Sequence, residues 1–207
     1  MPSGCLAGHC LGMTNTISLD STLARLAPNA AVAAACLGIP GDLYHFATPS
    51  LTAASHTLLF KVHGVLLVTA MILLLVALLG FAAGLGERLG RDGLAVLAVA
   101  FVGTVLVIAN IATEAFTFPQ AAEHLDPQGY WLAVIILSFG LYAVGWLGIA
   151  VLAARRRMAP PAATILLGVG AVYAFTPFPG AYLGLLVGGA VVIGLAARAR
   201  AVVLTPA

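Results

Sequence analysis

The sequence predicts an all-α integral membrane protein, a bundle of six transmembrane helices with both termini in the cytoplasm. Hydrophobic residues make up 62% of the 207 residues and charged residues only 8%, whereas about a quarter of the residues in soluble domains are charged. The apolar residues form six segments, each near the roughly 20 residues that cross a hydrocarbon core about 30 Å thick. The arginines fall between alternate segments, which indicates that one side of the membrane holds all of them.

Glycines, prolines and charged residues bound the six segments. The first segment, Leu23–Ile39, ends at Pro40-Gly41, and residues 42–55 are predicted to form a loop. The turn Gly86–Gly93 holds four charges and three glycines and is predicted to be a solvated hairpin. The other predicted helices are Thr57–Gly84, Leu94–Phe118, Tyr130–Ala153, Pro161–Thr176 and Ala181–Ala197.

The predicted transmembrane domain covers residues 23–197, between a short cytoplasmic tail at residues 1–22 and another at residues 198–207. Met13 is an alternative translation start to Met1. With six crossings every arginine lies on the cytoplasmic side, as the positive-inside rule requires for a protein of the cytoplasmic membrane. The net charge of +2 is too small to indicate nucleic acid as a partner. The expected partner is the lipid bilayer.

Small residues recur every four positions in two of the segments. Gly180, Gly184 and Gly188 share one face near the C-terminus, and Gly80 and Gly84 have the same spacing. Such faces let helices approach closely in lipid. Oligomerisation and packing within one chain both explain the pattern, and packing within the chain is the simpler interpretation.

Few ionisable or polar residues lie inside the apolar segments, and such residues are functional candidates by default because their burial in lipid is costly. His56 and His63 are seven residues apart and share a helical face, whereas Lys61 projects almost opposite His63. Asn110 and Glu114 form a polar stripe on the third segment.

The fourth segment adds Ser138 and Tyr142, four residues apart, and the fifth adds Tyr173 near its outer end. Counted from the outer helix ends, His63, Asn110 and Ser138 lie on the order of 9–12 Å deep. These depths predict a polar pocket between the second, third and fourth segments that opens outward above an apolar floor.

Two functions fit this pocket, so whether the protein is an enzyme stays open. In the first, a binding, carrier or accessory protein recognises a lipophilic small molecule or a membrane partner subunit, with ligand contacts from Asn110, Ser138, Tyr173 and His56. In the second, a membrane enzyme acts on a lipid or isoprenoid, with Glu114 as general acid or base and His63 and Tyr142 assisting. A structural alternative pairs Glu114 with Lys61 and bonds His63 to a backbone carbonyl.

No metal ion or cofactor is predicted. His56 and His63 lie about 10 Å apart along the helix axis, too far to chelate one zinc ion without bending the helix. Cys5 and Cys10 flank His9, but a zinc site needs more ligands than these supply. The oligomeric state is open.

Three segments resemble a loose group of small bacterial, often actinobacterial, polytopic membrane proteins with a domain of unknown function. They are VHGVLLVTAMILLLVALLGFAAGLGERLGRDG, GTVLVIANIATEAFTFPQ and LAARRRMAPPAATILLGVGAVYAF. The resemblance implies a polytopic fold and a membrane location, and it carries no activity. In size, helix number and an intramembrane acid, the chain also distantly resembles the small integral-membrane terpene cyclases of bacterial pathways.

Overall fold

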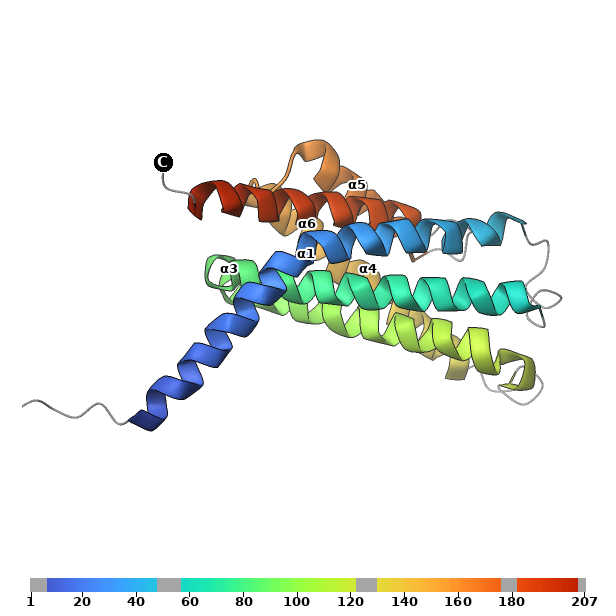
Figure 1. Ribbon diagram of the computed structural model, residues 1–207. Helices are drawn as coiled ribbons and strands as arrows, with labels where there is room; N and C mark the ends of the chain where they lie inside the picture. The colour runs from blue at the N-terminus through green and yellow to red at the C-terminus, as the bar shows by residue number, and fades with distance from the viewer. Residues whose placement is uncertain (1–6, 48–56, 122–129, 176–181, 205–207) are drawn as a thin grey trace, which may run out of the picture.

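The computed structural model describes the chain at residues 7–47, 57–121, 130–175 and 182–204, with side chains at 22–44, 57–84, 89–113, 115–116, 133–175, 182 and 184–195. The regular structure in these ranges is α-helical (Figure 1), which confirms the predicted all-α fold for this part of the chain. The helices are α1 (Ala7–Ala47), α3 (Leu58–Ala121), α4 (Tyr130–Arg155), α5 (Pro161–Tyr173) and α6 (Leu183–Leu204).

Helix α3 consists of two antiparallel arms, residues 58–89 and 91–121, which reverse direction at Gly90 (Figure 1). Gly90 has φ 64° and ψ −176°, a conformation that is open to glycine because it has no Cβ atom. Gly64 on the first arm packs directly against Ala115 on the second. The reversal predicted at Gly86–Gly93 is therefore confirmed.

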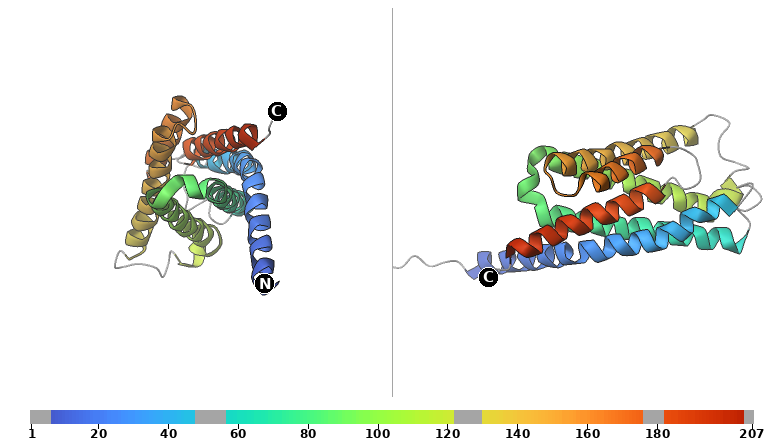
Figure 2. Two further views of the ribbon diagram at one scale, coloured as in Figure 1. Left: turned by 90° about the vertical axis from the view of Figure 1, so that its left-hand side faces the viewer. Right: turned by 90° about the horizontal axis from the view of Figure 1, so that it is seen from above.

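Helix α1 extends beyond both of its predicted bounds, and the predicted stop at Pro40-Gly41 is wrong. A proline inside a helix removes one backbone hydrogen bond and crowds the preceding turn. Close packing on either side of Pro40 offsets this cost, since Gly38 lies against Leu186 of α6 and Gly41 against Leu67 of α3. Residues 42–47, predicted as part of a loop, are consequently helical. The first part of α1 projects away from the other helices (Figures 1 and 2).

Four helical segments are long and apolar enough to cross a membrane: Thr22–Tyr44, Leu58–Gly84, Leu89–Thr113 and Ala133–Arg155. Shorter apolar stretches occupy Pro161–Tyr173 and Gly184–Leu195. Large apolar side chains on the outer faces are exposed, as a lipid-facing surface requires, for example Leu137 and Val144. These features identify a multi-pass membrane protein.

The helices pack as a closed ring in the order α1, α3, α4, α5, α6 and back to α1, and α6 also touches α3 (Figure 2). Small residues lie at the closest approaches. Gly103 packs against the backbone of Tyr142, and Gly170 packs against Gly184. Gly188 packs against Leu167. Gly184 and Gly188 thus serve packing within the chain, the interpretation favoured from their spacing, while Gly180 lies outside the described residues.

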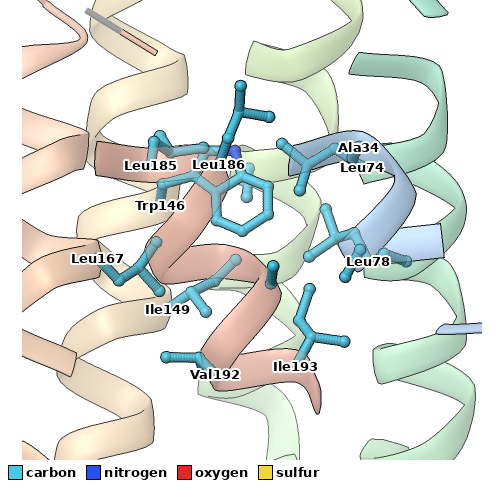
Figure 3. Packing of buried hydrophobic residues seen from close by; sticks show 14 of the residues in the cluster. Ala34, Leu74, Leu78, Trp146, Ile149, Leu167, Leu185, Leu186, Val192 and Ile193 are labelled. Atoms are coloured by element: carbon cyan, nitrogen blue, oxygen red, sulfur yellow. The ribbon is translucent and has the colours of Figure 1, made fainter. Parts of the chain in front are cut away.

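The centre of the ring is apolar and close-packed. Trp146 is fully buried, and Figure 3 shows it among aliphatic side chains that include Leu74, Leu185 and Leu186. Its indole nitrogen donates a hydrogen bond of 3.1 Å to Thr104 Oγ1, whose own proton goes to the Ala100 carbonyl at 2.7 Å. The polar atoms at this depth therefore satisfy one another.

Candidate functional site

Buried polar side chains gather in the half of the bundle that lies farthest from Gly90. Four of them, Asp42, His63, Asn110 and Ser138, occupy this half, and we call them the polar cluster. The other buried polar side chains in the described part of the chain are Thr104 and Thr164. The cluster draws on α1, both arms of α3, and α4.

Contacts between helices fix the level of each member along the bundle. Gly41 faces Leu67, which places Asp42 at the level of the first turns of α3, close to His63. Tyr142 packs against Gly103, so Ser138, one turn earlier in α4, lies farther from Gly90. From this register, Asn110 and Ser138 differ in level by roughly 5 Å.

His63 joins the first arm of α3 to α1. It is 6% exposed, and its Nδ1 lies 2.5 Å from the carbonyl oxygen of Gly41. Because a carbonyl oxygen only accepts hydrogen bonds, the ring carries a proton on Nδ1. The rings of Tyr44 and Phe60 flank the imidazole, with centroids at 5.1 Å and 5.8 Å. The structural alternative for His63, a bond to a backbone carbonyl, is the one the structure shows.

Asp42 joins α1 to the start of α6. Its side chain is 1% exposed, and Oδ2 accepts a hydrogen bond of 3.0 Å from the backbone nitrogen of Tyr182. The Tyr182 carbonyl accepts the first bond of the helix, from Leu186 N at 2.8 Å. The carboxylate therefore sits at the N-terminus of α6, where unpaired amides and the helix dipole favour negative charge.

The sequence-based prediction missed Asp42 because it placed this residue in a loop. A usable signal was present in the spacing of small residues. Ala27, Ala31, Ala34 and Gly38 are buried on one face of α1, and the same helical period continues through Pro40 to Asp42. This periodicity indicated that the helix continues beyond Pro40.

Tyr142 is fully buried rather than lining an open surface. Its hydroxyl lies 3.5 Å from Met71 Sδ, and its ring meets that of Tyr182 at 6.4 Å. Helices α3 and α4 and the residue before α6 thus meet at Tyr142.

Ser138 and Asn110 differ in how their donors are used. Ser138 Oγ donates to the Val134 carbonyl of its own helix at 2.6 Å, a common way for serine to satisfy itself in an apolar helix. Asn110 is 8% exposed, and its Nδ2 has no hydrogen-bond partner among the described residues. A buried amide donor without a partner is costly, so the Asn110 amide is the member of the cluster best suited to meet a bound molecule.

Of the remaining predicted site residues, the structure describes the side chain of Tyr173, which lies outside the polar cluster. Tyr173, near the end of α5, is 41% exposed. Glu114 lies on α3 but its side chain is outside the described residues, as is all of His56. Lys61 is exposed, and its predicted pairing with Glu114 stays a prediction.

No three histidine, cysteine, aspartate or glutamate side chains come together as metal ligands within the described ranges. Comparison with known proteins finds no matching family, no matching curated protein and no matching solved structure.

Proposed function

We propose that this chain is a six-crossing protein of the cytoplasmic membrane that binds a lipophilic small molecule or a membrane partner subunit from its outer face. The polar cluster carries this proposal. Two ionisable side chains and two neutral polar ones are buried in one half of a mostly apolar bundle. Ionisable and polar residues are costly within a membrane, so those that face the interior of a helix bundle are candidates for a binding site.

Binding fits the described groups better than catalysis does. Asp42, His63 and Tyr142 each interact across a helix interface, with Tyr182 N, Gly41 O and Met71 Sδ. Side chains that hold helices together are poorly placed to exchange protons with a substrate. The Asn110 amide donor instead suits a hydrogen-bond acceptor, such as a carbonyl or ether oxygen, on a lipophilic ligand.

The orientation we propose rests on the arginines. Arg156 Nη2 donates a hydrogen bond of 3.2 Å to the Leu89 carbonyl, so the turn after α4 and the turn at Gly90 lie at the same end of the bundle. Arg91 and Arg155–Arg157 are exposed there. By the positive-inside rule this end faces the cytoplasm, and the polar cluster lies in the outer half.

Native mass spectrometry of the detergent-extracted protein tests the binding proposal. The wild type should retain a small molecule or a partner subunit, and Asn110→Leu should lose it because leucine offers no donor. Thr113→Val on the same helix is the matched control, since the Thr113 hydroxyl already donates to the Ala109 carbonyl at 2.8 Å. Equal retention by the wild type and Asn110→Leu would contradict the proposal.

The enzyme alternative makes a different prediction for the same preparation. The retained molecule would be chemically converted on incubation, and Glu114→Gln would abolish the conversion while the protein still inserts normally. A binding protein shows no conversion with either residue at position 114.

A further inference from the structure

The end of the bundle at Gly90 carries a basic rim. Arg91 and the three arginines of the segment Arg155–Arg157 are exposed on it, against one acid with a described side chain, Asp92. In the neighbouring sequence Glu87 and Arg88 balance each other. The rim therefore holds a clear excess of positive charge in one place.

Backbone geometry shows that Arg157 occupies a position more suitable for glycine. Arg157 N bonds to the Ala154 carbonyl at 3.2 Å and Met158 N to the Ala153 carbonyl at 2.9 Å, the pair of bonds that ends a helix in a Schellman motif. The residue in the left-handed conformation of this motif is usually glycine, but here it is Arg157, with φ 51°.

The Arg157 side chain is exposed, so packing against the bundle does not account for an arginine at this strained position. A residue that keeps a costly conformation on the surface points to a role for its side chain. The property that distinguishes it from glycine here is the guanidinium group.

Two candidate membrane spans have an end at the rim, as expected for a surface at the level of lipid headgroups. The apolar segment Ala133–Arg155 ends at the arginines, and the segment Leu89–Thr113 begins at the same end of the bundle. Guanidinium groups form paired hydrogen bonds with phosphate oxygens, and anionic lipids attract basic segments that flank a membrane span.

We propose that Arg155 and Arg157, together with Arg91, form a binding surface for the phosphate headgroups of anionic phospholipids. The hydrogen bond from Arg156 to the Leu89 carbonyl holds the turn after α4 beside the turn at Gly90. Because Arg91 is two residues from Leu89, this bond also places Arg91 at the same end of the bundle as the other arginines. The proposal is independent of what binds at the polar cluster.

Lipid titration of the full-length protein in detergent, followed by native mass spectrometry, tests it. The wild type should bind phosphatidylglycerol more tightly than phosphatidylcholine, and the preference should weaken at high salt. Arg157→Gly should bind phosphatidylglycerol roughly fivefold more weakly. Its thermal stability in phosphatidylcholine should be equal or higher, because glycine adopts the left-handed conformation without strain.

Arg157→Lys is the matched control, because it keeps the charge and the backbone cost. It should bind phosphatidylglycerol roughly twofold more weakly than the wild type, because an ammonium group cannot form the paired hydrogen bonds, but more tightly than Arg157→Gly, because it keeps the charge. The proposal is overturned if Arg157→Gly binds this lipid as well as the wild type, or if lysine and glycine weaken binding equally. Saturation of the surface by soluble glycerol phosphate would also overturn it, in favour of a soluble phosphate compound.

Discussion

At the scale of single residues, Asp42 has the largest predicted effect. Asp42→Leu removes the acceptor for Tyr182 N and leaves a buried amide unpaired, which should lower the unfolding free energy by about 3 kcal/mol. Asp42→Asn keeps an acceptor oxygen and loses the interaction of the charge with the α6 dipole, so it should cost less, about 1 kcal/mol. Unfolding by sodium dodecyl sulfate in mixed micelles measures both variants.

The ranking of the two Asp42 variants decides what the carboxylate does. Equal losses for asparagine and leucine would show that negative charge, rather than the acceptor position, holds α6 to α1. Ser138→Ala provides a control at the same end of the bundle, since its hydroxyl bonds only within α4 in the described structure. It should change the unfolding free energy by less than about 1 kcal/mol.

Residue chemistry alone identified three of the four members of the polar cluster. His63, Asn110 and Ser138 were singled out because polar atoms are rare in apolar segments, and all three are buried. The partner of His63 could not be identified, because the Gly41 carbonyl lies on a helix that was predicted to end before it. Asp42 was missed because it lies beyond the predicted end of the first helix. Its hydrogen bond to Tyr182 N also joins residues that are far apart in the sequence.

At the scale of elements, close contact between α3 and α4 depends on Gly103. A Cβ atom at Gly103 would overlap the backbone of Tyr142, and backbone cannot move aside as a flexible side chain can. Gly103→Ala should therefore push the helices apart and lower the unfolding free energy by about 2 kcal/mol. Detergent unfolding checks this prediction.

Gly194→Ala is the matched control on α6. An added Cβ atom at Gly194 meets nothing within 4 Å, so the same substitution should be neutral or should stabilise by up to about 1 kcal/mol through reduced backbone entropy. A loss at Gly194 equal to that at Gly103 would mean that the effect belongs to glycine in helices generally and not to the contact of α3 with α4.

Element boundaries were predictable where the chain itself enforces them. The Gly90 reversal follows from a turn rich in glycine and charge, which cannot stay in lipid. The predicted end of α1 was wrong. The prediction relied on the tendency of Pro40 to end a helix, but the residues beside it pack against Leu67 and Leu186, which are distant in the sequence. The prediction for α5 was too long. The helix ends at Tyr173 and has 13 residues, whereas it was predicted to continue to Thr176.

At the scale of the whole molecule, the proposed topology predicts which residues can be labelled from each side of the membrane. In a cysteine-free background, Asp92→Cys and Pro160→Cys should react with an impermeant maleimide from the cytoplasmic side, and Thr57→Cys from the outer side. All three residues are exposed, and none is an arginine, so the charges that set the orientation stay in place. In a variant that lacks Cys5 and Cys10 but keeps Cys36, this cysteine, exposed on α1 within a membrane segment, should be protected from both sides.

The α5–α6 pair provides the strictest test of six crossings. The 13 residues of α5 extend roughly 20 Å, less than a hydrocarbon core of about 30 Å, so residues after α5 must complete the crossing. If they do, Phe178→Cys, outside the described residues, should react from the same side as Thr57→Cys. Reaction from the cytoplasmic side, or from neither side, would mean that α5 and α6 form a hairpin that enters the membrane without crossing it. The basic rim and the polar cluster would then face opposite sides of a membrane crossed four times, and the two termini would still share one side.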